Sequence, residues 1–167
     1  MIGLVWAQSA NGVIGAGGRI PWRVPEDLAH FSQLTGGSTV VMGRATWESL
    51  PARFRPLPGR RNLVLSRDAG YDAPGAEVVT DLDTALDTAL DGAGDVWVVG
   101  GRAVYEAALA RADVLVVTEV DLHVEGDTFA PAVGEPWRPV GAGEWRTSSA
   151  GPRFRVVTWR RADRPAG

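Results

Sequence analysis

Short apolar segments rich in β-branched residues alternate with helical patterns along most of the chain. A strand buried on both faces reads as a continuous apolar segment, and a helix between two such strands returns the chain so that they run parallel. Strands are expected at 2–7, 39–42, 62–65, 77–79, 96–99, 114–120 and 154–159, and helices at 25–34, 44–50, 82–90 and 101–110. The alternation predicts an α/β protein whose largely parallel sheet is covered by helices on both faces.

The end of the chain departs from this alternation. The strands expected at 114–120 and 154–159 follow one another without an obvious helix, so at least one antiparallel edge is expected. No internal repeat and no linker divides the 167 residues, which are enough for one domain with its own core. We expect a single domain over 1–160, followed by a flexible tail at 161–167.

The composition argues against several classes of protein and site. A net charge of −3 provides no basic field for nucleic acid. No apolar segment is long enough to cross a bilayer and no secretory signal begins the chain, so we expect a cytoplasmic protein without a membrane partner. Cysteine is absent, which removes disulfides and thiol chemistry. His30 and His123 begin no metal-ligand pattern, so no metal site is expected.

An acidic helix start follows a proline-rich turn near the N-terminus. Pro25 suits the first helical position, and Glu26 and Asp27 suit the positive end of the helix dipole. Asp27 lies one residue before Leu28 and four before Phe31, so it borders the apolar face. A carboxylate facing an apolar pocket is costly unless a cationic or hydrogen-bonding ligand meets it. This spacing alone favours a solvated acid over a functional one.

Three segments share one design, in which an apolar strand leads through a turn to a polar or helical start; they are 40–46, 63–67 and 96–105. Free N–H groups at a helix start attract phosphate, and glycine lets a ligand approach the backbone. Arg44 and Arg67 stand where strands end, at the ligand-binding edge of an open α/β sheet, and arginine there accommodates a 2′-phosphate. The segments together predict a site for a large anionic nucleotide, with the phosphorylated nicotinamide cofactor favoured.

The order and spacing of several motifs resemble those of bacterial dihydrofolate reductases over 1–160. The motifs are Val13-Ile14-Gly15, Pro21-Trp22-Arg23-Val24-Pro25-Glu26-Asp27, Val41-Met42-Gly43-Arg44-Ala45-Thr46-Trp47-Glu48-Ser49, Pro56-Leu57-Pro58-Gly59-Arg60, Leu65-Ser66-Arg67, Gly100-Gly101-Arg102-Ala103-Val104-Tyr105 and Val124-Glu125-Gly126-Asp127-Thr128. The resemblance implies a mostly parallel eight-stranded central sheet with an antiparallel C-terminal edge and about four flanking helices. It also implies a monomeric enzyme that binds antifolates and reduces 7,8-dihydrofolate to 5,6,7,8-tetrahydrofolate with NADPH, for one-carbon metabolism.

The resemblance implies roles for the residues around the substrate. Asp27 is the implied pocket acid that holds the amidine edge of the pterin, with Trp22 holding an ordered water and Thr118 supporting Asp27. Arg60 is the implied clamp on the α-carboxylate of the glutamate tail, because its planar fork binds carboxylates bidentately. The walls of the substrate pocket are assigned to Val5, Trp6, Ala7, Leu28, Phe31, Leu50, Leu57 and Tyr105.

The resemblance also implies a mobile loop at 9–20 that closes over the nicotinamide and bonds to Asp127, and a cis peptide between Gly100 and Gly101. Contacts to NADPH are assigned to Ala7, Ile14, Gly15, Ile20, Gly43, Arg44, Ala45, Thr46, Leu65, Ser66, Arg67, Val99, Gly100, Gly101, Arg102, Ala103, Val104 and Tyr105. Two positions depart from the family, since Ala45 stands where a polar or basic residue is frequent and Arg102 where a small one is usual. The phosphate contacts from positions 45 and 103 are therefore left open.

Two alternatives share parts of this prediction. A reductase of riboflavin biosynthesis has the same fold and cofactor but needs a further phosphate site, and Asp27 and Arg60 in their motifs argue against it. A catalytically silent NADPH-binding module is the second alternative, and the intact pocket acid and tail-binding arginine argue against that as well.

Overall fold

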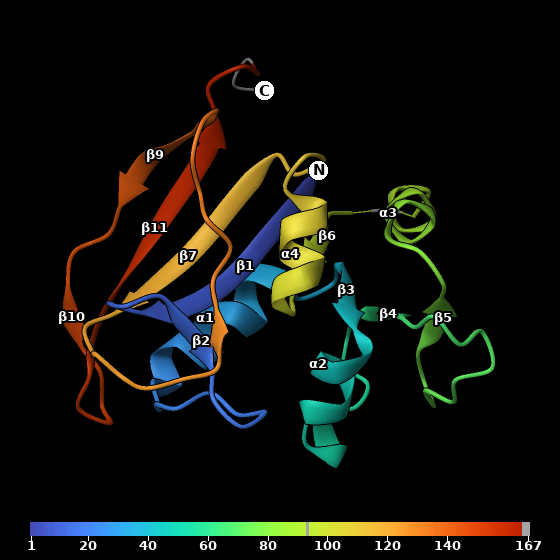
Figure 1. Cartoon of the computed structure of the whole chain (residues 1–167), viewed down its shortest axis with the longest axis horizontal. Coiled ribbons are helices and arrows are strands. Elements are labelled where there is room, and N and C mark those ends of the chain that lie inside the picture. Colours follow the sequence, from blue (N-terminus) through green and yellow to red (C-terminus); the bar gives the residue numbers. More distant parts are fainter. Residues whose placement is uncertain (93, 165–167) are drawn as a thin grey trace.

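The computed structural model describes residues 1–92 and 94–164, and its centre is one twisted mixed sheet with helices on both faces (Figure 1). The strands of this sheet are β1 (Ile2–Ser9), β3 (Thr39–Gly43), β4 (Arg61–Leu65), β5 (Glu77–Val79), β6 (Val96–Val98), β7 (Val114–Val120), β9 (Trp137–Ala142), β10 (Arg146–Thr147) and β11 (Arg153–Arg161). The helices are α1 (Pro25–Thr35), α2 (Arg44–Ser49), α3 (Leu82–Leu90) and α4 (Arg102–Ala108), with a 3₁₀ turn, η1 (Ala52–Phe54), after α2.

The strand order is β10-β11-β7-β1-β6-β3-β4-β5, and β9 also pairs with β11. Since β9 and β10 pair with successive parts of β11, they share the outermost position, and the sheet is eight positions wide. The pairs from β7 to β5 are parallel, whereas β11 runs antiparallel to β7, β9 and β10. The predicted mostly parallel sheet with an antiparallel C-terminal edge is confirmed.

The sequence did not predict four short or polar strands, which are β2 (Val13–Gly15), β8 (Thr128–Phe129), β9 and β10. β2 and β8 form a separate antiparallel pair, so part of the segment expected as a loop at 9–20 is a strand. β9 is mostly exposed and contains proline and glycine, which hides the alternation typical of a strand.

β11 ends at Arg161, so the segment expected as a flexible tail at 161–167 begins inside a strand. Arg164 in this segment binds Asp113 at 2.7 Å. Residues 165–167 of that segment lie outside the described residues.

Two hydrophobic clusters cover the two faces of the sheet. Val5 packs on one face with α1 and α2, whereas Leu4 and Trp6 pack on the other with α3 and α4. This division follows from the period of two along β1, since successive side chains of a strand point to opposite faces. The central strand β1 thus presents one set of side chains to α1 and another to α4.

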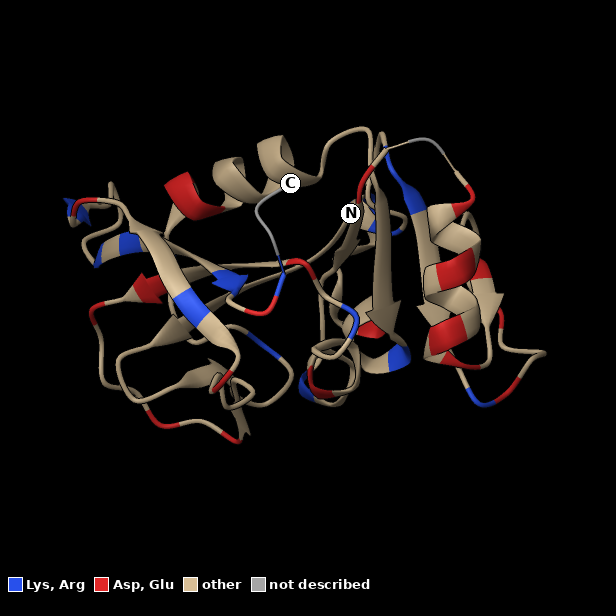
Figure 2. Cartoon of the chain, turned by 90° about the horizontal axis from the view of Figure 1, so that it is seen from above, with Lys and Arg blue, Asp and Glu red and all other residues tan. Residues whose placement is uncertain are grey.

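Charged side chains on α3 are paired as well as solvated. Figure 2 shows acidic residues along this helix, where Arg111 binds Asp83 at 3.1 Å and Asp87 at 2.6 Å. Asp81 caps the helix, because its Oδ1 accepts a hydrogen bond from the Thr84 N–H at 2.8 Å. The acidic side chains of α3 are therefore exposed to solvent and also paired with Arg111. Among the described helices, none is both long and apolar enough to span a membrane.

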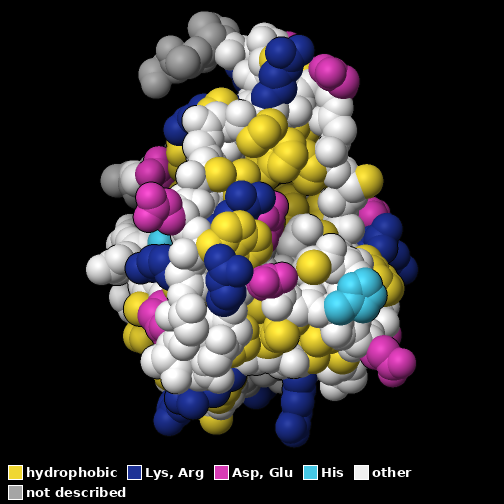
Figure 3. Space-filling view, turned by 90° about the vertical axis from the view of Figure 1, so that its left-hand side faces the viewer, with side chains coloured by type: hydrophobic (Ala, Val, Ile, Leu, Met, Phe, Trp, Pro, Cys, Tyr) yellow, Lys and Arg dark blue, Asp and Glu magenta, His cyan; other side chains and the backbone are white. Residues whose placement is uncertain are grey.

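The C-terminal edge of the sheet combines arginine with aromatic side chains. Figure 3 views the molecule from this side, where basic groups lie among hydrophobic ones. The Cζ atoms of Arg155 and Arg153 lie 4.8 and 5.6 Å from the ring centroid of Trp145, and that of Arg146 lies 4.8 Å from the ring of Phe154. These stacks place arginine guanidinium groups over the aromatic rings of this edge.

Substitution of Gly3 in β1 tests the packing of the central strand. A Cβ atom at this position would lie 2.4 Å from Cζ3 of Trp97, its partner on β6. We expect Gly3→Ala to lower the free energy of unfolding by about 1–3 kcal/mol, because a buried indole on a central strand cannot move away cheaply. Urea denaturation measures the change, with Gly134→Ala as control, since its methyl group would meet no described atom within 4 Å. Equal stability of the two variants would contradict this packing argument.

Candidate active site

Asp27 is turned toward the sheet rather than into water. Its Oδ1 accepts a hydrogen bond from the Thr118 hydroxyl of β7 at 2.5 Å, and His30 Nδ1 lies 3.8 Å from the same oxygen. The Asp27 side chain is 20% exposed, so a ligand can reach a carboxylate that is otherwise largely shielded. The sequence spacing alone favoured a solvated acid, whereas in the structure the Asp27 carboxylate is mostly shielded and bonded to Thr118.

Glu26, the other acid of this helical turn, faces a different partner. Its carboxylate accepts hydrogen bonds from the Ser149 N–H and hydroxyl, both at 2.8 Å, and these bonds lower the pKa of Glu26. The first turn of α1 is therefore attached to β7 through Asp27 and to the turn before β11 through Glu26. The partners lie more than ninety residues away in sequence, so helical periodicity gave no signal for them.

An apolar wall lies beside Asp27 on the α1 face of the sheet. Val5 and Leu57 are buried there, and Phe31 and Leu50 are half-buried. Two of the other residues expected at the site are open to solvent, since Leu28 is 62% and Ile20 57% exposed. Ala7 is half-buried on β1 and pairs with Thr118. Trp22 packs near the start of α1 against the cluster of Val24, Val120 and Phe154.

Trp6 and Tyr105 lie on the opposite face from this wall. Their ring centroids are 5.2 Å apart within the cluster beneath α3 and α4, and Trp6 Nε1 donates to Gln8 Oε1 at 2.8 Å. The Tyr105 hydroxyl donates to the backbone oxygen of Val5 at 2.7 Å, and burial raises the pKa of Tyr105. The side chain of Trp6 therefore does not share a face with Val5, because neighbouring residues of a strand alternate. Ile14, Leu65 and Val104 border the same cluster, and Val99 borders the α1 cluster.

Arg60 is held at the far end of α1. Its Nη1 donates to Thr35 Oγ1 at 3.0 Å and its Nε to the Pro58 oxygen at 2.9 Å, while its Cζ lies 5.9 Å from the centroid of the Phe31 ring. Partial burial lowers the pKa of the Arg60 guanidinium below its ordinary value. Eight residues of helix separate Asp27 from Thr35, about 12 Å along the axis. One helix thus places an anion and a cation at opposite ends of an apolar wall.

Two helix starts meet at the ends of the neighbouring strands β3 and β6. α2 follows Gly43 and α4 follows Gly101, and neither helix has a side-chain cap. The Gly43 N–H donates to the Gly100 oxygen at 2.8 Å, and the expected cis peptide between Gly100 and Gly101 is present. A Cβ at Gly100 would lie 2.9 Å from Thr46 Oγ1, so only glycine fits this close approach. The uncapped N–H groups and the tight turn form a cradle for an anionic group.

Arginines border this cradle, and each helix-initial arginine has an acidic partner. Arg44 Nε donates to Glu48 Oε1 at 2.9 Å, and Arg102 Nε donates to Glu106 Oε1 at 2.8 Å. The i,i+4 spacing of these pairs is visible in the sequence, although their partners were not predicted. Arg67, Ala45 and Ala103 are exposed at the rim, and Ser66, next to Arg67, is buried. Gly43 pairs with Leu65, so Arg44 and Arg67 follow adjacent strands.

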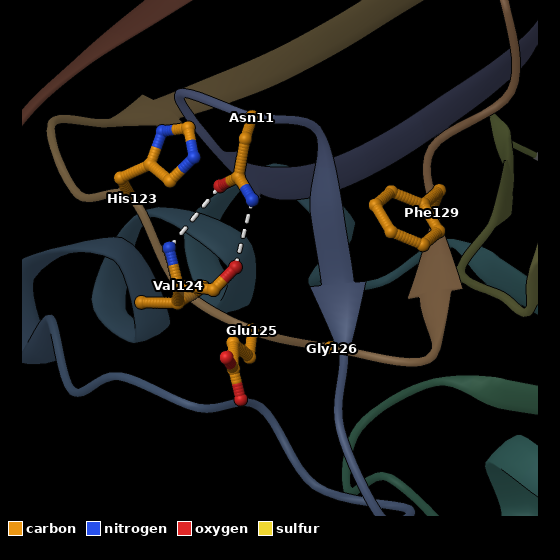
Figure 4. A pocket seen from close by; sticks show the side chains of 6 residues that line it. All are labelled: Asn11, His123, Val124, Glu125, Gly126 and Phe129. Atoms are coloured by element: carbon orange, nitrogen blue, oxygen red, sulfur yellow. Dashed lines mark hydrogen bonds between the residues drawn. The ribbon is translucent and has the colours of Figure 1, made fainter.

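The loop at 9–20 is bonded along its length to the segment before and within β8. Asn11 Nδ2 donates to the Val124 oxygen at 2.7 Å and its Oδ1 accepts from the Val124 N–H at 3.2 Å (Figure 4). β2 then pairs with β8, and the Gly17 N–H donates to Asp127 Oδ2 at 2.9 Å. The expected bond between Asp127 and this loop is present, and Gly15 lies in the paired strand itself.

The chain is similar over nearly its whole length to known proteins of one family. The family model described as dihydrofolate reductase matches residues 1–161. Dihydrofolate reductases of Mycobacterium tuberculosis and Mycobacterium leprae are 53% and 49% identical to this chain, each over 97% of it and 99% of the relative. A solved structure of dihydrofolate reductase from Enterococcus faecalis, complexed with NADP(H) and RAB-propyl, superposes with a TM-score of 0.91 at 33% identity, over 98% of this chain and 97% of that one.

The contact between Asp127 and Gly17 predicts how the loop responds to substitution. We expect Asp127→Ala to speed amide hydrogen exchange of Gly17 by roughly fivefold, because the N–H loses its acceptor. Exchange measured by NMR tests this, with Asp121→Ala, on the same connecting segment, as control. An unchanged Gly17 rate would mean that the Asp127 contact does not protect this part of the loop.

The same contact has a defined pH dependence. Hydrogen bonds from Gly17 and Thr128 lower the pKa of Asp127 from its ordinary value of 3.8. A lowered folded-state pKa means that the contact is complete at neutral pH and is lost only as the pH falls through that lowered value. Protection of Gly17 should therefore remain constant from pH 8 to pH 5.

Proposed function

Because this chain belongs to the dihydrofolate reductase family, we propose that it reduces 7,8-dihydrofolate to 5,6,7,8-tetrahydrofolate with NADPH, using Asp27 and Arg60 to hold the two ends of the substrate. One observation carries the residue assignment: Asp27 lies in the first turn of α1, Arg60 binds Thr35 at the other end of α1, and Phe31 lies between them on an apolar wall. An elongated ligand with a cationic ring at one end and a carboxylate at the other matches this arrangement.

At the ring end, Asp27 accepts hydrogen bonds from N3 and the 2-amino group of the pterin. Thr118 donates to Asp27 Oδ1, which keeps the carboxylate oriented as an acceptor toward the ligand. The family resemblance assigns Asp27 to the amidine edge, away from N5, so in this proposal water rather than Asp27 delivers the proton to N5. Trp22, beside the start of α1, holds such a water. Asp27 then contributes by binding the pterin and favouring its reactive tautomer.

The residues at the ends of β3, β4 and β6 fit NADPH. The uncapped starts of α2 and α4, the Gly100–Gly101 turn and Thr46 suit a pyrophosphate, and Arg44, Ser66 and Arg67 suit the 2′-phosphate. When bound, NADPH supplies the hydride that reaches C6 of the substrate. The loop at 9–20, held by Asp127, excludes water from the reacting atoms and brings Ile20 over the site.

The relatives and the solved structure described above are all dihydrofolate reductases, so they do not favour the riboflavin-pathway reductase or the silent module. Substrate and antifolate-type small molecules are the partners of the site. We also propose that one chain, as a single domain over 1–160, acts as a monomer, because it provides every assigned substrate and cofactor residue. A cytoplasmic location is proposed from the absence of cysteine, which suits a reducing compartment.

Asp27→Asn tests the pocket acid. The amide keeps the shape of the side chain but removes the charge that pairs with the pterin, so kcat/KM at pH 7 should fall at least ~10²-fold, or roughly 3 kcal/mol. The decay of NADPH absorbance on addition of dihydrofolate measures the change, with Asp121→Asn as an exposed control. Near-normal turnover at pH 7 would reject Asp27 as the essential acid.

Arg60→Leu tests the tail clamp. Loss of a charge-assisted bidentate pair should weaken dihydrofolate binding by roughly 2–4 kcal/mol, because the tail carboxylate loses its partner. Arg60→Lys should recover only part of this, since an ammonium does not reproduce the planar fork. Binding of NADPH and of antifolates without a glutamate tail, measured by titration, serves as control and should change little. Equal weakening of tail-bearing and tail-less ligands would show that Arg60 shapes the pocket instead.

A further inference from the structure

Arg44, Glu48 and Tyr71 form a set in which each side chain contacts the other two. Arg44 Nε and the Tyr71 hydroxyl both donate to Glu48 Oε1 at 2.9 Å. The Arg44 Cζ lies 4.1 Å from the centroid of the Tyr71 ring, so the guanidinium also stacks on that ring. Arg44 and Glu48 belong to α2, whereas Tyr71 lies between β4 and β5.

This set fixes the direction in which Arg44 presents its donors. Glu48 binds the Nε corner, which leaves the terminal Nη1–Nη2 edge for bidentate binding of a phosphate. Stacking on Tyr71 restricts the plane of the guanidinium. A fork held in one plane loses less conformational entropy when an anion binds than a freely rotating one.

Tyr71 also connects Arg44 to the turn that carries Ser66 and Arg67. The Tyr71 N–H donates to the Asp68 oxygen at 3.1 Å, and the Asp68 N–H donates to Ser66 Oγ at 3.2 Å. The Tyr71 ring is half-buried against the cluster beneath α1 and α2. A single aromatic ring therefore ties the turn after β4 to the start of α2, where the two arginines of the proposed 2′-phosphate site are located.

The charge states of the set are constant near neutral pH. Hydrogen bonds from Arg44 and Tyr71 lower the pKa of Glu48, so its carboxylate stays ionised. Burial and the contact with Glu48 raise the pKa of Tyr71, so its hydroxyl stays a donor. The geometry that orients Arg44 is thus available at the pH at which a cofactor would bind.

We propose that Tyr71 is a positioning residue for cofactor choice, which acts through Arg44 and Glu48 to favour NADPH over NADH. The proposal rests on the proposed function, since it assumes that Arg44 meets the 2′-phosphate. In this proposal Tyr71 does not contact the 2′-phosphate. It orients Arg44, which does.

The test is the ratio of the Kd for NADH to the Kd for NADPH, measured by fluorescence titration of the purified chain. Tyr71→Leu removes the ring and the hydroxyl, and should lower this ratio roughly three- to tenfold, mainly by weakening NADPH. Tyr71→Phe keeps the ring beneath Arg44 and should recover most of the ratio. An unchanged ratio in Tyr71→Leu, or equal weakening of both cofactors, would overturn the proposal.

Two controls separate this role from general packing. Trp145→Leu removes an aromatic ring stacked with Arg155 at the C-terminal edge of the sheet, and should leave the ratio unchanged. In an Arg44→Ala background, Tyr71→Leu should cause no further fall in the ratio, because its effect passes through Arg44. A fall of the same size in that background would overturn the proposal.

The outcome also distinguishes this proposal from the proposed function. A wild-type chain that does not oxidise NADPH in the presence of dihydrofolate would reject the function and this proposal with it. A wild-type chain that reduces dihydrofolate and prefers NADPH, but keeps its preference in Tyr71→Leu, would reject only the role of Tyr71.

Discussion

The alternation of side chains along β1 is the constraint on which the rest of the site depends. Val5 points to α1 and the apolar wall beside Asp27, whereas Trp6 points to α4 and stacks with Tyr105. The Tyr105 hydroxyl crosses back to the Val5 oxygen, so the central strand joins the two cores at this point. A shift of β1 by one residue would exchange the two faces and separate the acid from its wall. The register of β1 against β6 and β7 therefore determines which side chains face the site.

The arginines of the site are positioned by neighbours rather than by charge alone. Glu48 and Tyr71 orient Arg44, Thr35 and the Pro58 carbonyl orient Arg60, and Glu106 binds Arg102. A flexible cation must lose rotamer freedom when it binds an anion, and prior contacts reduce that loss. Arg60 is the most confined of these, since partial burial and two hydrogen bonds hold it against α1. Under the proposal for Tyr71, the choice of cofactor would depend on a residue that does not itself touch the cofactor.

The sequence predicted the continuous apolar strands and the four helices to within two residues at their ends, because buried parallel strands and the Asp81 cap of α3 give strong local signals. It missed β2, β8, β9 and β10, which are short, exposed or interrupted by proline and glycine. Motif spacing identified Asp27, Arg60 and Asp127, but not which way they point. The contacts of Asp27 with Thr118, of Glu26 with Ser149 and of Glu48 with Tyr71 join distant segments, so only the folded chain reveals them.

The shared outer position of β9 and β10 has a consequence for how folded molecules meet one another. An uninterrupted edge strand would offer a row of unpaired N–H and C=O groups to the sheet of a second molecule. Here the row is broken between the two short strands, Pro139 lacks an N–H, and Arg138 and Arg146 bring charge to the rim. Such a rim disfavours edge-to-edge pairing with the sheet of a second molecule, so the same residues that weaken the strand signal also protect this edge of the sheet.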